Sequence, residues 1–405
     1  MDKMDEKYIK LLIDRCTNVK NIGVLVISYS KEIQPFVDKI VEYVKNIGVE
    51  DIYLDCEDKY KVHDELKTMS YTDIDNSPYF NKRIWDEYVK KGASFLMFET
   101  EIPNLNNDID PKKISYATKV QRTTKPLYRK LQLQCKLAWC IASYPGEAWA
   151  KSIYKNDEFA YDKLKSAIYK MCMIDRDNPV EEWDNLINKN TKIINKLNSL
   201  NLEKLHYKNS LGTDLEIYLP ENYLYSGARD ELCIVNMPSY EVFTSPIYNK
   251  TNGIVYSSKP LFYNDACIDS FWIKFKDGKV IDFDAKVGKE VLEEIINSDE
   301  YSCYLGEAAL VEAGSPIDAM NINFGTTLID ENASCHLALG AGFSECIQNG
   351  TLMDEKELFS HGINVSKQHV DFMMGTDDLN IIGTTHDGKE IKIFENGKFS
   401  QEVLN

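Results

Sequence analysis

The hydrophobic pattern of this chain changes near residue 200, and this change constrains the fold more than any other feature of the sequence. In the first half, helical spacing over Tyr8–Cys16 and Ile33–Ile47 alternates with short apolar runs at Ile22–Ser28 and Ile52–Leu54. Such alternation is typical of an α/β layer with parallel strands. Two more runs, at 93–98 and 137–143, extend the predicted sheet. We therefore expect an α/β amino-terminal domain.

Downstream of residue 200, apolar residues alternate with polar ones, as they do in half-buried strands. The clearest case is Ser270–Phe275 and Lys279–Phe283, which are joined by the hairpin signal Asp277-Gly278. A helix-like connector, Val180–Leu200, precedes this region. At 405 residues the chain is long enough for two domains. The sequence predicts an α/β domain that ends in the connector and a β-rich α+β domain, at 1–200 and 201–405.

Composition excludes several classes of partner. The net charge of -17 argues against nucleic acid and against an anionic membrane surface, because both attract basic patches. The first residues are charged, and no apolar run is long enough to span a bilayer. The ten cysteines are scattered without a CxxC pair, which favours buried thiols in a reducing compartment. We expect a cytoplasmic protein.

The first predicted strand is not followed by a phosphate-binding loop. The turn after it reads Ser28–Glu32 and contains neither GxGxxG nor GxxxxGK[ST]. A nucleotide-binding role for the amino-terminal half is therefore set aside.

Two of the six histidines lie beside acids in an otherwise small and apolar region. His336 closes the segment Glu331–His336, and His369 begins the motif His369-Val370-Asp371. Successive side chains of a strand point to opposite faces, so His369 and Asp371 share one face. Glu241 and Glu307 are two more acids in apolar or turn-like settings. Buried carboxylates are costly unless they are paired or bind a metal, so a shared metal site explains the set.

Three carboxylates and two imidazoles suit Zn²⁺, Co²⁺ or Mn²⁺, and they suffice for two ions if one carboxylate bridges them. Each residue alone also has an ordinary structural interpretation, which the spacing leaves open. A Cys335 nucleophile is a further alternative, but the adjacent His336 faces the other side of a strand and is poorly placed as its base.

Four ordered segments carry a resemblance to a known family. They are Met237–Pro246, Leu305–Val311, Asp330–Gly340 and His369–Gly375. Together they resemble the M29 family of metallo-aminopeptidases, in the group of aminopeptidase T, aminopeptidase S and PepS, and weaker similarity covers nearly the whole chain.

The resemblance implies a ligand set, a reaction and an assembly. Two divalent ions would be held by five residues, Glu241, Glu307, His336, His369 and Asp371, with Glu307 as the bridge and a catalytic group. The reaction would remove the amino-terminal residue from peptides with a free amino terminus. The family also implies a homodimer with an enclosed active-site cavity.

One position departs from the family pattern. Where family members often carry a tyrosine seven residues after the ligand histidine, this chain has Phe343. A phenol can ligate a metal or donate to an oxyanion, and a phenyl ring cannot. Tyr240, beside Glu241, is one candidate substitute. The departure motivates two competing hypotheses, namely a catalytically weak metal- or peptide-binding homologue and an amidase-type metallohydrolase.

Overall fold

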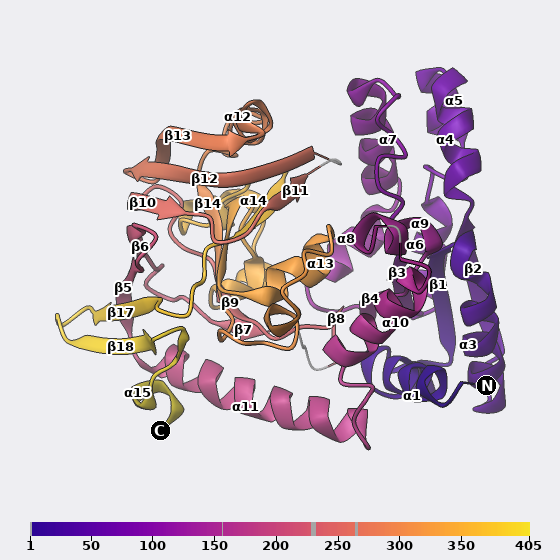
Figure 1. Cartoon of the computed structure of the whole chain (residues 1–405), viewed down its shortest axis with the longest axis horizontal. Coiled ribbons are helices and arrows are strands. Elements are labelled where there is room, and N and C mark those ends of the chain that lie inside the picture. The colour runs from indigo at the N-terminus through magenta and orange to yellow at the C-terminus, as the bar shows by residue number, and fades with distance from the viewer. Residues whose placement is uncertain (1, 156, 228–231, 264–265) are drawn as a thin grey trace. The chain divides into compact units, whose positions relative to one another are not determined.

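The computed structural model describes residues 2–155, 157–227, 232–263 and 266–405 (Figure 1). The described residues form two compact units. The first lies within Met1–Trp183 and Arg229–Met237, and the second within Asp184–Ala228 and Pro238–Asn405. The sequence-based division near residue 200 falls at the end of helix α11 (Pro179–Ser199) and stays a prediction.

The first unit is built on a five-stranded sheet with the order β2-β1-β3-β4-β8, in which every neighbouring pair is parallel. The apolar runs of the first half form four of these strands, as expected. The fifth is a two-residue strand from much later in the chain. The bounds are β1 Val24–Ser30, β2 Asp51–Glu57, β3 Ser94–Glu99, β4 Trp139–Ser143 and β8 Asn236–Met237.

Helices pack around this sheet (Figure 1). Helix α3 shows why: Phe36, Val37, Ile40 and Val44 recur at helical spacing and are buried, while its other face is polar. The principal helices are α1 Lys3–Leu11, α3 Gln34–Asn46, α4 Lys59–Thr68, α5 Tyr71–Asn76, α6 Arg83–Lys90, α7 Pro111–Thr123, α8 Pro126–Leu133, α9 Glu147–Ile153 and α10 Ala160–Met171.

The second unit contains two largely antiparallel sheets. The larger has nine strands in the order β11-β12-β10-β6-β5-β17-β18-β19, with β13 paired to β12. Its strands are β5 Leu202–Lys208, β6 Asp214–Tyr218, β10 Asn252–Tyr256, β11 Leu261–Tyr263, β12 Ala266–Lys276, β13 Lys279–Val287, β17 Asn380–Thr385, β18 Glu390–Glu395 and β19 Lys398–Phe399. The expected hairpin at Asp277-Gly278 joins β12 to β13.

The smaller sheet of the second unit has the order β16-β15-β14-β9-β7. Its strands are β7 Ser226–Gly227, β9 Val242–Thr244, β14 Leu305–Leu310, β15 His336–Gly340 and β16 His369–Met373. Short helices, including α12 (Lys289–Ile296), α13 (Thr327–Asp330) and α14 (Glu355–Ser360), connect the strands.

One hydrophobic core joins the two sheets of the second unit. Leu205 and Ile217 from the larger sheet belong to the same buried cluster as Leu337, Leu339 and Phe372 from the smaller one. Alternation along β15 and β16 sends these side chains to the core and leaves the opposite face for polar groups. The predicted fold class, an α/β unit plus a β-rich unit, is confirmed.

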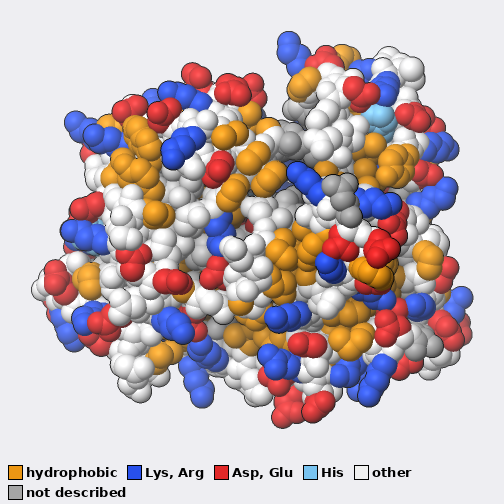
Figure 2. Space-filling view, in the orientation of Figure 1, with side chains coloured by type: hydrophobic (Ala, Val, Ile, Leu, Met, Phe, Trp, Pro, Cys, Tyr) orange, Lys and Arg blue, Asp and Glu red, His pale blue; other side chains and the backbone are white. Residues whose placement is uncertain are grey.

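The surface of the described chain is mixed in charge. On the face drawn in Figure 2, acidic and basic side chains are interspersed, although the whole chain carries a net charge of -17. Within the described residues, no helix is both long and apolar enough to cross a membrane.

Candidate metal centre

The smaller sheet brings the predicted ligands to one face. In the strand register, Glu307 of β14 lies opposite Ala338 of β15, and Ala338 lies opposite Asp371 of β16. His336 and His369 are each two residues from a member of this row, so they point to the same side. The row has a small side chain at its centre, which leaves space between the two carboxylates.

Five predicted site residues thus meet in space, although they are spread over positions 241 to 371 of the sequence. Their donor atoms form two groups, Glu241–Glu307–His336 and Glu307–His369–Asp371, and within each group the atoms lie within 4.8 Å of one another. The Nε2 atom of His336 is 3.2 Å from Glu241 Oε2. The Nε2 atom of His369 is 3.0 Å from Glu307 Oε2 and 3.1 Å from Asp371 Oδ1. Glu307 is common to both groups, which is the position that a bridging carboxylate needs.

Backbone carbonyls orient both imidazoles. The Nδ1–H of His369 donates to the Ala341 carbonyl at 2.7 Å, and the Nδ1 of His336 faces the Ser334 carbonyl at 3.2 Å. With Nδ1 engaged in this way, each ring directs Nε2 toward the carboxylates. Metal-binding histidines are commonly fixed by such a hydrogen bond on the other nitrogen.

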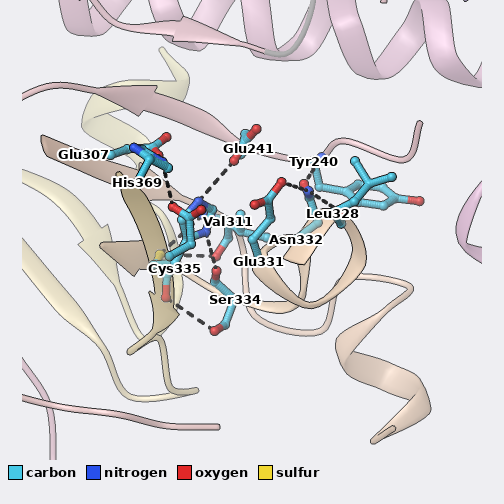
Figure 3. Close-up of polar contacts among 12 residues, drawn as sticks. Tyr240, Glu241, Glu307, Val311, Leu328, Glu331, Asn332, Ser334, Cys335 and His369 are labelled. Carbon is cyan, nitrogen blue, oxygen red and sulfur yellow. Dashed lines mark hydrogen bonds and ion pairs between the residues drawn. The ribbon is translucent and has the colours of Figure 1, made fainter. Parts of the chain in front are cut away.

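Glu331 is a further acid at the site, and no role had been assigned to it from the sequence. It is buried in the one-turn helix Glu331–Ala333, and Figure 3 shows its carboxylate turned toward Glu241. Its neighbour Asn332 holds the local chain: Asn332 Oδ1 accepts the Tyr240 N–H at 2.6 Å, and its Nδ2 donates to the Leu328 carbonyl at 3.2 Å. The sequence did place Glu331 near a proposed ligand, five residues before His336. A separation of five residues, however, brings two side chains to a common face in neither a strand nor a helix, so the pattern did not mark Glu331 as a site residue.

The pKa shifts describe an excess of buried negative charge. Burial and the neighbouring Glu241 and Asp371 carboxylates hold the pKa of Glu331 well above its usual range. Burial likewise raises the pKa of Glu307. Burial alone would lower the pKa of His336, but the hydrogen bond to Glu241 and the negative charges of the surrounding carboxylates together outweigh it and raise this pKa to about 9. Four carboxylates against two imidazoles in a buried site favour a bound cation. The nitrogen and oxygen donors suit a divalent transition metal.

Phe343 lies against the site without offering a polar atom to it. Its ring centroid is 4.9 Å from that of His369 and 5.2 Å from that of Phe243. Tyr240 does not replace the family tyrosine, because its ring extends away from the carboxylates and imidazoles (Figure 3). The hydroxyl that the resemblance leads one to expect is therefore supplied by neither residue.

Cys335 is packed into the core on the other side of the strand. Its thiol contacts the Val311 backbone, at 3.3 Å from both the N–H and the carbonyl. Burial raises the pKa of the thiol to about 12. A neutral, buried thiol is a poor nucleophile, so this alternative receives no support from the geometry.

The model of the M29 family of thermophilic metalloproteases matches residues 1–399 of the chain. Aminopeptidase 2 of Geobacillus stearothermophilus is 34% identical, with 99% of each protein covered. Aminopeptidase AmpS of Bacillus subtilis is 33% identical, over 99% of this chain and 100% of that protein. The structure of wild-type AmpT from Thermus thermophilus matches with a TM-score of 0.88 at 25% identity, over 98% of each chain. The chain therefore belongs to the M29 metalloprotease family.

Proposed function

We propose that this protein is a metal-dependent aminopeptidase, which hydrolyses the amino-terminal peptide bond of peptides. One observation carries the proposal: two groups of possible metal ligands share Glu307 at the buried face of the smaller sheet. The aminopeptidase relatives and the metalloprotease family support the same reaction.

We further propose that the site takes two divalent ions, with Zn²⁺, Co²⁺ and Mn²⁺ as candidates. The charges support this number. Glu241, Glu307, Glu331 and Asp371 carry a formal charge of about −4 when ionised, and two divalent ions supply about +4. Glu241 and His336 would hold one ion, His369 and Asp371 the other, and Glu307 both.

When bound, such a pair of ions polarises the scissile carbonyl and lowers the pKa of water. The chain's own residues have the other tasks. The Ser334 and Ala341 carbonyls keep both imidazoles in the tautomer that presents Nε2. Glu331 belongs to neither ligand group, so it is the carboxylate available to take up a proton beside the site and pass it to the leaving amine.

The acidic lining also accounts for recognition of a free amino terminus. An α-ammonium group is a cation that Glu331 or Asp371 can accept, whereas an acetylated terminus has lost that charge. Peptides with unblocked amino termini are therefore the proposed substrates.

The test is hydrolysis of a matched pair of peptides, one with a free amino terminus and one acetylated, before and after chelation. We expect release of the first residue from the free peptide alone, loss of activity with the chelator, and recovery with added metal. Stoichiometric metal without turnover would favour the weak binding homologue. Equal turnover of the two peptides, or hydrolysis of small amides only, would contradict aminopeptidase activity.

Three further proposals are a cytoplasmic location, which the scattered cysteines support, and a homodimer and a division of labour in which residues 201–405 carry the catalytic site, both of which the family resemblance supports. Sedimentation of the purified protein measures the second directly, and a monomer at micromolar concentration would contradict it.

A further inference from the structure

A cavity lies beside the candidate metal centre, within the second unit. Its volume is about 330 Å³, which is within the range of small-molecule sites. Ser334 and Cys335, which immediately precede His336, form part of its wall together with Val311. Figure 3 shows these three residues next to the proposed metal ligands. The cavity is separate from the ligand cluster, and its wall includes the two residues that immediately precede β15.

The polar part of the wall carries both signs of charge. Lys259 Nζ lies 2.7 Å from Asp318 Oδ1, and both side chains are about three-quarters buried, with exposed fractions of 27% and 24%. Asp377 lines the same cavity and is exposed. The cavity wall therefore carries one ammonium and two carboxylates, and a ligand would share Lys259 and Asp318 with the ion pair that they form.

Ser258 adds a buried hydroxyl that has no partner. Its backbone N–H donates to the Met373 carbonyl at 2.9 Å, which fixes the residue to the end of β16. Its Oγ atom is buried and lacks a hydrogen-bond partner among the described residues. A buried hydroxyl left unpaired is costly, and a ligand that bonds to it removes that cost.

Another part of the wall is apolar. Leu211, Val311, Leu379 and Phe394 line it. A cavity with a few charged groups at one side and aliphatic side chains at the other suits a small zwitterion that has an apolar side chain.

We propose that this cavity binds a free α-amino acid with an aliphatic side chain. The carboxylate pairs with Lys259 and accepts the Ser258 hydroxyl, the ammonium pairs with Asp318 or Asp377, and the side chain lies against the leucines. The choice of an amino acid rests on the proposed function, since an aminopeptidase releases this product. The charge pattern and the unpaired hydroxyl do not depend on it.

The cavity also borders a residue that orients a proposed metal ligand. Ser334, which lines the cavity, is also the residue whose carbonyl faces His336 Nδ1 at 3.2 Å.

Calorimetry on the zinc-loaded, full-length protein tests the chemistry of the ligand. L-leucine is the probe, with N-acetyl-L-leucine and L-leucinamide as analogues that each lack one charge. We expect L-leucine to bind at least tenfold more tightly than either analogue. Lys259→Met should weaken its binding at least tenfold, while Lys274→Met, at an exposed position on β12, should not change it. Unchanged binding in Lys259→Met, or no binding of L-leucine at 20 mM, overturns the proposal.

Methyl NMR locates the ligand without a variant. With L-leucine present, the methyl signals of Val311 and Leu379 should shift, while those of Leu292, which does not line the cavity, should not. Binding without shifts at Val311 and Leu379 would place the amino acid elsewhere and contradict the inference. The two proposals can fail separately. Peptide hydrolysis without amino-acid binding at the cavity overturns only the binding proposal, and amino-acid binding at the cavity without hydrolysis overturns only the proposed aminopeptidase activity.

Discussion

The Nε2 atom of His369 lies 3.0 Å from Oε2 of Glu307, and Glu307 also belongs to the group that contains His336. If Glu307 holds both ions, its loss should affect both. We predict that Glu307→Ala binds no metal stoichiometrically, whereas His336→Ala and His369→Ala each keep about one ion. Native mass spectrometry of the metal-loaded variants measures this.

The matched control for that series is Glu293→Gln, an exposed glutamate in α12. It should retain the wild-type metal content. One ion retained in Glu307→Ala would show that Glu307 serves a single ion and would contradict the bridge.

The small side chain of Ala338 is predicted to be a requirement of the site. It lies in the row between Glu307 and Asp371. Ala338→Leu should fill the space between these carboxylates and weaken metal binding at least tenfold, with a loss of roughly 1–3 kcal/mol in the free energy of unfolding. Ala338→Gly leaves the space open and should bind metal as the wild type does. Metal titration followed by calorimetry distinguishes them, and equal affinity in the two variants would refute the requirement.

Phe343 provides a gain-of-function test. A hydroxyl on this ring, which contacts His369, would supply a donor that the described site lacks at that position. Loss of one such donor elsewhere lowers rates by roughly 10²- to 10³-fold. We predict that Phe343→Tyr raises kcat about tenfold or more, with metal content unchanged. Phe243→Tyr, on the neighbouring ring, is the comparison. Equal kcat in Phe343→Tyr and the wild type would show that the departure is neutral.

In the first unit, Lys125 should titrate abnormally. Its ammonium lies 3.8 Å from the centroid of the Trp85 ring, and the nearby Asp55 carboxylate is already paired with Lys82 at 2.9 Å. Burial, together with Lys82, lowers the pKa of Lys125 to about 8. In the unfolded chain the lysine has its ordinary pKa of about 10.4. Between the folded pKa and this value, the unfolded chain therefore binds more protons than the folded state. Stability therefore rises with pH in that window.

Urea unfolding of the wild type and of Lys125→Met at pH 7.5 and pH 10 checks the sign. The wild type should gain on the order of 1 kcal/mol relative to the variant as pH rises, after allowance for solvent screening. Lys130→Met, at an exposed position on α8, should follow the wild type. A gain at pH 10 in Lys125→Met as large as in the wild type would contradict the assignment.

The spacing of apolar residues predicted most of the helices and strands, because it depends only on residues that are close in sequence. The runs at 93–98 and 137–143 became β3 and β4, and the connector at 180–200 became α11. Strand β8 was not predicted, because two residues carry no period and pair with β4 only through a long-range contact. The small sheet that assembles the site likewise depends on pairings between distant strands.

Part of the candidate site was predictable because it depends on local spacing within one strand. The spacing of His369 and Asp371 fixes their common face. The apolar or turn-like settings of Glu241, Glu307 and His336 marked these three as candidates, and the family resemblance implied one ligand set. Glu331 has no such spacing, since it lies in a one-turn helix before β15. Its place beside Glu241 depends on Asn332, which links the segment to Tyr240.

The most direct test of the account is the metal content of the active wild-type protein, measured by native mass spectrometry alongside hydrolysis of an unblocked peptide. We predict two divalent ions per chain, with activity that falls and returns in step with their removal and replacement. Full aminopeptidase activity in protein that carries no metal would contradict the central claim.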